Sequence, residues 1–242
     1  MLKNLPLTIN KKLFGFLFLG FILATIVGTL SFAVGGFIVA KSLGIDAGIN
    51  YQGYRTRIGE KELWEHRIYL INIQQKYHDE LKNNIDFPEK SAYEQQLLMH
   101  KTAVRDNKYM HYGATGFPII IGTFGFIHLF LFRRKYQGIT TLNFKKWFFI
   151  FVTLFWLRSM YVLFGSGIYL SIAYPDYHGG ILPFNNSAFI IITGLFGTIV
   201  LKIVVFKFIP ISERLTFLLS GFAGGIIGFG LWFSILGKYL LP

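Results

Sequence analysis

The longest uncharged stretch of the chain, residues 13–40, constrains its fold more than any other feature. Its 28 residues, LFGFLFLGFILATIVGTLSFAVGGFIVA, contain no Asp, Glu, Lys or Arg. A helix rises about 1.5 Å per residue, and the hydrocarbon core of a bilayer is about 30 Å thick. A helix of this length is therefore long enough to cross a membrane at a tilt, and its glycines would let another helix approach closely.

Four further apolar stretches follow, and they define the predicted fold class. They cover residues 113–132, 144–174, 187–208 and 215–236. Only 15% of the residues are charged, against about 25% in soluble domains. We therefore expect an all-α polytopic membrane protein with about five transmembrane helices and a polar helical-hairpin segment.

Three regions follow from this pattern. The first is 1–40, a basic leader with the first transmembrane helix, the second is the polar segment 41–112, and the third is the four-helix transmembrane region 113–242. Within the polar segment, 44–51 has turn-forming residues that allow a short hairpin. Residues 60–82 predict a helix with Leu70, Ile73, Tyr77 and Leu81 on one face, and a second, antiparallel surface helix is expected over 86–108.

The placement of charge indicates the partners and the orientation. The chain carries 24 Lys and Arg against 12 Asp and Glu, but ten of the acids lie in 46–106. The excess of basic residues lies beside the apolar stretches, as in 11–12, 133–135 and 145–146. This pattern favours membrane lipids as partners over nucleic acid, and it predicts a cytoplasmic N-terminus with the polar segment outside.

Candidate chemistry is sparse. Arg158 stands within the third apolar stretch, where a charge marks either a substrate or proton site or a structural anchor to backbone carbonyls or a hydroxyl. In the predicted topology His111, Asp176 and His178 share one side of the membrane and offer three possible zinc ligands, although their spacing matches no motif. The absence of cysteine excludes disulfides and thiolate metal sites. We expect no cofactor.

Several stretches resemble the site-2-type family of intramembrane zinc metalloproteases, in its compact bacterial form. The segment Val39-Ala40-Lys41-Ser42-Leu43-Gly44 is similar to the tail that follows the family's His-Glu-Leu-Gly-His motif. Gly113-Ala114-Thr115-Gly116-Phe117-Pro118 resembles the start of its next membrane segment, and Phe155-Trp156-Leu157-Arg158 and 210–242 are also similar. The resemblance implies the protease fold, with a groove for a membrane helix, and a location in a bacterial inner membrane.

The chain departs from this family at the residues that carry catalysis. Phe32 stands where the first zinc histidine would be, Ala33 replaces the general-base glutamate, and Gly36 replaces the second histidine. Because a zinc hydrolase needs three protein ligands and a proton-handling group, the resemblance implies a pseudoprotease rather than an enzyme.

Three functions remain open at this point. The first is a catalytically inactive, protease-like protein that binds or scaffolds a membrane partner, most simply another integral membrane protein. The second is an accessory subunit of a larger membrane complex. The third is a transporter or metal-dependent membrane enzyme that uses Arg158, Asp176 and His178.

Overall fold

The computed structural model describes residues 9–51, 53–56, 60–136, 141–160 and 187–241. In chain order the elements are α1 (Lys11–Ser42), β1 (Ala47–Asn50), β2 (Gly53–Thr56), α2 (Glu60–Lys76), α3 (His78–Lys82), α4 (Lys90–Leu131), the 3₁₀ turn η1 (Arg133–Tyr136), α5 (Phe144–Thr153), the 3₁₀ turn η2 (Leu154–Trp156), α7 (Ser187–Ile203), the π-helical η3 (Val204–Phe208), α8 (Ile211–Leu231), the π-helical η4 (Trp232–Leu236) and α9 (Gly237–Leu240).

Four of the described helical segments are long and apolar enough to cross a membrane. They are Lys11–Ser42, Lys90–Leu131, Ile191–Phe208 and Ile211–Leu240. They agree with four of the five expected spans. The third expected span, 144–174, is helical over 144–160, and the rest of it lies outside the described residues.

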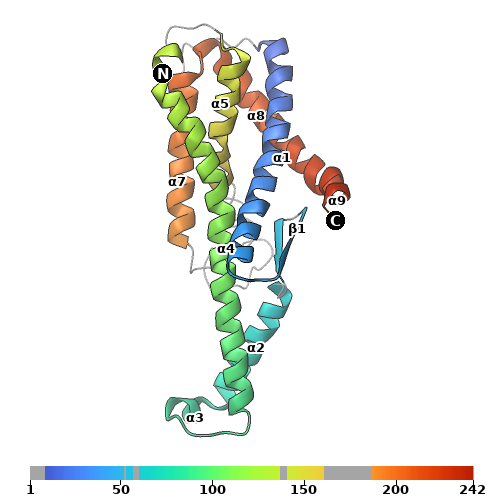
Figure 1. The fold of residues 1–242 in the computed structure, drawn as a ribbon, viewed down its shortest axis with the longest axis vertical. Helices are drawn as coiled ribbons and strands as arrows, with labels where there is room; N and C mark the ends of the chain where they lie inside the picture. The colour runs from blue at the N-terminus through green and yellow to red at the C-terminus, as the bar shows by residue number, and fades with distance from the viewer. Residues whose placement is uncertain (1–8, 52, 57–59, 137–140, 161–186, 242) are drawn as a thin grey trace.

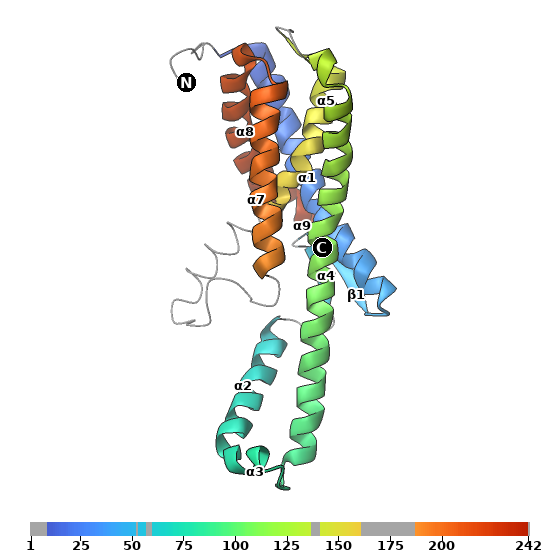
Figure 2. The ribbon, with the colours of Figure 1, turned by 90° about the vertical axis from the view of Figure 1, so that its left-hand side faces the viewer.

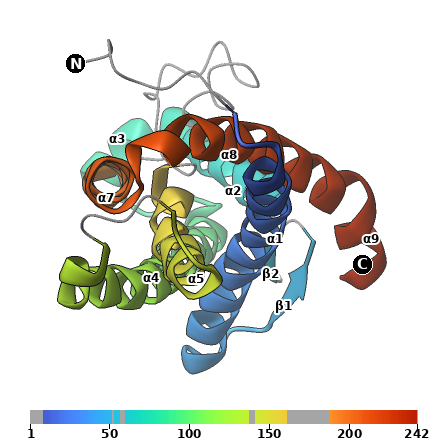
Figure 3. The same ribbon diagram turned by 90° about the horizontal axis from the view of Figure 1, so that it is seen from above.

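The helices surround α1. Seen from above, α8 lies on one side of α1, and α4 and α5 lie on the other (Figure 3). The largest apolar core joins α1, α4, α5, α7 and α8, and its most enclosed side chains include Leu17, Leu129, Trp147, Val204 and Phe217. The Trp147 and Phe217 rings stack with their centroids 5.8 Å apart.

A cluster of positive charges lies at one end of this bundle, where α1 and α5 begin and α4 ends (Figure 1), and we call it the basic end. It comprises Lys11, Lys12, Arg133, Arg134, Lys135, Lys145, Lys146, Lys207 and Arg214. Several of these cations are satisfied locally. The Lys146 ammonium donates to the carbonyl oxygen of Lys135 at 2.7 Å, and the Arg214 guanidinium donates to that of Phe206 at 2.7 Å. The sequence predicts this cluster, because its excess of basic residues lies beside the apolar stretches.

At the opposite end, α2, α3 and the first half of α4 project beyond the bundle as a helical stalk (Figures 1 and 2). Leu70 and Ile73 of α2 are buried against Phe87 and Tyr93, with Tyr77 and Leu81 packed around them. The predicted apolar face of this helix is therefore confirmed. α3 ends at Lys82, where the expected helix 60–82 ends, and Asn84 follows in the left-handed conformation with φ of 53°.

The stalk differs from expectation in two respects: the helix expected over 60–82 is interrupted at Tyr77, between α2 and α3, and α4 is a single helix of 42 residues. It runs without interruption through the expected boundary at residue 112 and through Pro118. The glycines before Pro118 do not break the helix, because Gly113 lies against α1 instead. A Cβ at Gly113 would lie 2.6 Å from the carbonyl oxygen of Gly35, so only glycine permits this crossing.

The end of α1 leads into a small antiparallel hairpin, in which Ala47 pairs with Thr56 and Asn50 with Gly53. The helix ends in a Schellman motif: the Ile45 amide donates to the Ala40 carbonyl at 2.9 Å, and Gly44 has φ of +70°. The predicted hairpin is therefore present, and it extends beyond residue 51 to Thr56.

The hairpin turn also holds the C-terminal helices. The indole Nε1–H of Trp232 donates to the Tyr51 carbonyl oxygen at 2.7 Å, and the Tyr51 amide donates to the Leu241 carbonyl oxygen at 3.0 Å. These bonds tie residues about 180 positions apart in the chain. The C-terminus thus lies beside the hairpin (Figure 1).

We expect the Trp232 bond to contribute measurably to stability. Trp232→Phe should lower the free energy of unfolding by about 1 kcal/mol more than Trp156→Phe, because the part-buried Tyr51 carbonyl loses its donor. Trp156 is a matched control, since its Nε1 has no acceptor among the described residues. Denaturation of both variants in detergent micelles measures the difference, and equal losses would contradict the assigned role.

Candidate functional site

Phe32, Ala33 and Gly36 lie in the last third of α1, and Phe32 is the centre of a polar and aromatic cluster. Its ring lies 4.5 Å from the guanidinium carbon of Arg158, 6.2 Å from the Tyr54 ring and 6.2 Å from the His111 ring. These side chains come from α1, β2, α4 and the third expected span. We call them the Phe32 cluster.

Arg158 contacts the face of the Phe32 ring. A guanidinium over an aromatic face is worth about 2 kcal/mol when both groups are shielded from water. The sequence gives no sign of this contact, because Phe32 and Arg158 are 126 positions apart and belong to no common motif. The contact places Arg158 at the level of the hairpin.

Gly36, one helical turn after Phe32, also faces Tyr54. A Cβ at this position would collide with the Tyr54 ring. The face of α1 that carries Phe32 and Gly36 is therefore covered by Tyr54. Ala33 is buried, with 2% of its surface exposed. A histidine at position 36 would displace the hairpin.

His111 is the one expected ligand that the structure describes within the cluster. Its Nε2 is buried and has no hydrogen-bond partner in the described part of the chain, and the same holds for Oγ1 of Thr115 one turn later. Asp176 and His178 lie outside the described residues. Among the residues that are described, no three His, Asp or Glu side chains are placed to hold a metal ion.

The described residues after Asp106 place no carboxylate near the Phe32 cluster. Beyond Asp106, the only acid among the described residues is Glu213, which is buried near the start of α8 at the basic end. The described part of the Phe32 cluster thus combines a cation, an imidazole and aromatic rings. Such a set can hold an anionic or aromatic group.

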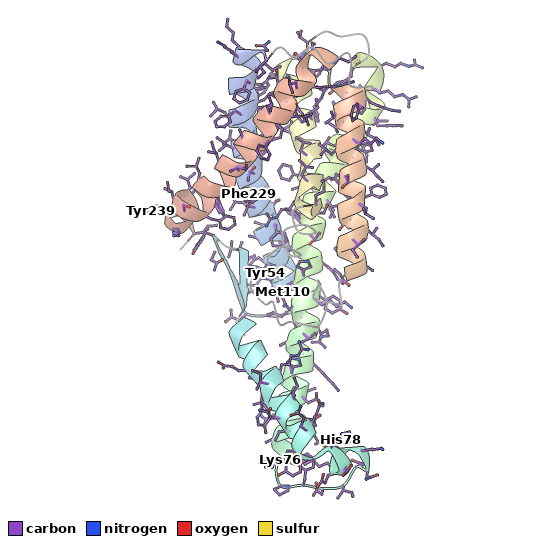
Figure 4. The ribbon with its side chains drawn as sticks, turned by 180° about the vertical axis from the view of Figure 1, so that it is seen from behind. Tyr54, Lys76, His78, Met110, Phe229 and Tyr239 are labelled. Atoms are coloured by element: carbon purple, nitrogen blue, oxygen red, sulfur yellow. The ribbon has the colours of Figure 1, made fainter. Side chains whose placement is uncertain are left out.

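The depth of the cluster follows from helix geometry. Phe32 comes 21 residues after Lys11 in α1, which is about 32 Å along the axis. His111 comes 20 residues before Leu131 in α4, which is about 30 Å. Measured along the axes of α1 and α4, the cluster is thus about 30 Å from the basic end. Tyr54 and Met110 mark this level in Figure 4.

A groove of about 430 Å³ begins at Arg158 and runs between α1, the η2 region and α8. Its walls are apolar and include Phe21 and Ala24 of α1, Leu154 and Leu157, and Phe217 and Phe229 of α8. Arg158 is the one charged side chain among the described residues that line it. Phe229, seen in Figure 4, lies between the basic end and the level of Tyr54.

Two glycines of the groove face open space. A Cβ added to Gly28 or to Gly225 would meet no atom within 4 Å, although both residues line the groove. By contrast, Gly221 and Gly224 lie against Phe21 and the Phe18 carbonyl of α1. Internal packing in the described residues therefore explains Gly221 and Gly224 but not Gly28 and Gly225.

Sequence reasoning identified Arg158, His111 and Phe32 separately but did not predict that they meet. It missed Tyr54 and the groove altogether. The glycines of the last span were a usable signal, since they predicted close helix packing, but they gave no indication of which ones would remain uncovered.

No family model, curated protein or solved structure matches the chain.

Proposed function

We propose that this chain is a non-catalytic integral membrane protein that binds a membrane partner in the groove between α1, η2 and α8. The observation that carries the proposal is the open space beside Gly28 and Gly225. Gly15 and Gly230 are equally open, so what distinguishes Gly28 and Gly225 is that both line the groove. The volume of about 430 Å³ lies within the range of ligand pockets.

The chemistry of the Phe32 cluster supports binding over catalysis. A zinc hydrolase needs three protein ligands and a carboxylate that handles protons. In the described cluster the corresponding positions hold Phe32, Ala33 and Gly36, and Tyr54 covers the face where a second histidine would project. We also propose that the chain is a pseudoprotease related to the site-2-type proteases. The residues at positions 32, 33 and 36 support this relation.

The proposed orientation follows from the charges. Because the basic end gathers Lys and Arg from the leader and from the segments around 133–146 and 207–214, it would face the cytoplasm of a bacterial cell. The stalk would then project on the opposite side of the inner membrane.

A photoreactive phenylalanine analogue placed at position 222 tests the proposal. Phe222 lines the groove and is 73% exposed, whereas Phe124 of α4 is 70% exposed and does not line it. After illumination of native membranes, we expect one discrete adduct from position 222 and only diffuse lipid labelling from position 124. Equal patterns from the two positions would contradict a groove ligand.

The accessory-subunit function is supported by the stalk. Ile68, Ile71 and Leu98 are 42%, 41% and 67% exposed, although they project beyond the bundle. Contiguous exposed apolar patches mark protein contacts, and Ile68 and Ile71 lie one turn apart on α2. The same experiment separates the two functions, since a probe at Leu98 that captures a stoichiometric protein while position 222 captures nothing would favour the accessory subunit.

A further inference from the structure

We propose that the stalk binds a late first-row transition metal ion, of the class of Zn²⁺, between His66 of α2 and His100 of α4, with Gln96 as a third ligand. This site is separate from the groove and from the Phe32 cluster, and it does not depend on the proposed function. It is supported by the register of the two helices, the lack of partners for their buried polar atoms, and the charges and cavity beside them.

The register of α2 against α4 places the two histidines opposite each other. Ile73 and Tyr93 belong to one buried cluster, and the Gln74 amide donates to the Tyr93 hydroxyl at 3.1 Å. His66 lies seven residues before Ile73, and His100 lies seven residues after Tyr93. Seven residues make about two helical turns, so each histidine continues the buried face of its helix. Because α2 and α4 run in opposite directions (Figure 2), both histidines lie at one level, about 10 Å nearer the bundle than Ile73.

Three buried polar atoms at this level lack partners. They are Nδ1 of His66, Nδ1 of His100 and Oε1 of Gln96, none of which has a hydrogen-bond partner in the described part of the chain. Gln96 precedes His100 by four residues, so both lie on one face of α4. Over the described residues 65–110, no other buried side-chain nitrogen or oxygen is in this state. Since buried polar atoms are normally paired, a metal ion that accepts all three as ligands would account for them.

The charges beside the histidines select the kind of ion. Burial, the cation of Arg67 and the neighbouring His66 together lower the pKa of His100, which keeps its imidazole in the neutral form that binds metals. Lys101 and Arg105 line the cavity next to it, and none of the described residues that line this cavity is acidic. Ca²⁺ and Mg²⁺ are bound by carboxylate and other oxygen ligands, whereas imidazole suits Zn²⁺, Cu²⁺ and Ni²⁺.

The cavity beside His100 has a volume of about 370 Å³. It offers an ion a route to the site and leaves room for a water molecule, which would complete four-coordination with the three side chains. One of these side chains belongs to α2 and two belong to α4. A bound ion would therefore link the two helices near the bundle, where it would add to the apolar cluster that joins them around Leu70 and Tyr93.

Metal titration of the full chain tests the assignment. The protein is purified in detergent, stripped with EDTA and titrated with Zn²⁺ against a chromophoric competitor. We expect one Zn²⁺ per chain, and no binding of Mg²⁺ at the same concentration. His66→Leu and His100→Leu should each weaken Zn²⁺ binding by more than about tenfold, since loss of a group that merely supports a ligand already costs about that much.

His78→Leu is the matched control, because His78 is an exposed histidine of α3 in the same stalk. It should bind Zn²⁺ as the unsubstituted chain does. Leucine at position 66 or 100 extends the apolar faces that contain Leu70 and Leu97, so the stalk should stay packed. His66→Phe is a second variant that keeps an aromatic ring, and it should lose Zn²⁺ to the same extent as His66→Leu.

Hydrogen exchange measures the link between the helices. Zn²⁺ should slow amide exchange over residues 66–73 of α2 in the unsubstituted chain. His100→Leu should remove this effect although the substitution lies on α4, because the ion would then contact α2 alone. His78→Leu should leave the effect unchanged.

Several results would overturn the inference while leaving the groove and its proposed partner intact. They are the absence of bound Zn²⁺ in the unsubstituted chain, unchanged binding in His66→Phe and His100→Leu, and a loss in His78→Leu as large as theirs. Zn²⁺ binding without any change in the exchange of α2 would overturn the link between the two helices.

Discussion

Gly113→Leu is expected to separate α1 from α4 and to lower the free energy of unfolding by about 3 kcal/mol, the upper part of the usual range for overpacking. A Cβ at Gly113 would lie 2.6 Å from the Gly35 carbonyl oxygen and 2.9 Å from the Val39 Cβ. These obstacles are helix backbone and a β-branched side chain, which cannot move aside as the end of a flexible side chain can. Titration with SDS in mixed micelles measures the loss.

Gly116→Leu is the control for this substitution. Gly116 lies three residues further along α4, and a Cβ there would meet nothing within 4 Å. Both variants gain the same side chain and the same helix propensity, so their difference isolates the crossing of α1 and α4. A Gly113→Leu variant as stable as Gly116→Leu would show that the helices do not approach as described.

Trp147→Ala is expected to have a similarly large effect, with a loss of about 4 kcal/mol in the free energy of unfolding. Trp147 is 1% exposed, stacks on Phe217 and belongs to the core that joins α1, α4, α5, α7 and α8. Within a bilayer the lipid tails are as apolar as the core, so the loss arises from missing packing contacts rather than from hydration.

Phe148→Ala provides the comparison, because it follows Trp147 directly and is 52% exposed. About half of its surface faces away from the bundle. Its removal should therefore cost about 0.5 kcal/mol or less. The same SDS titration serves for both variants. Equal costs for the two aromatics would contradict the assignment of Trp147 to the core.

The helical spans and the stalk were predictable because their signals are local. An uncharged stretch such as 13–40 has few alternatives to a helix once water is excluded, since every backbone amide and carbonyl must be satisfied within the segment. The spacing of Leu70, Ile73 and Tyr77 predicted which face of α2 would be buried. Length and periodicity suffice for both conclusions.

The path of α4 was not predictable from the same signals. Gly113, Gly116 and Pro118 suggest a bent first turn for a new span, yet the helix continues through all three. Gly113 allows a contact with α1, which lies some 75 residues away in sequence. A local pattern cannot distinguish a glycine that breaks a helix from one that lets another helix approach.

The sequence by itself determined the all-α class, the position of four candidate spans and the excess of positive charge beside the apolar stretches. Only the tertiary structure decided that Phe32, Tyr54, His111 and Arg158 meet and that Gly28 and Gly225 border an open groove. The physical reason is that spans form from backbone hydrogen bonding within one segment, whereas the site forms from contacts between segments. Those contacts depend on how closely particular helices cross, and the crossing is set by glycines whose roles appear only when their neighbours are in place.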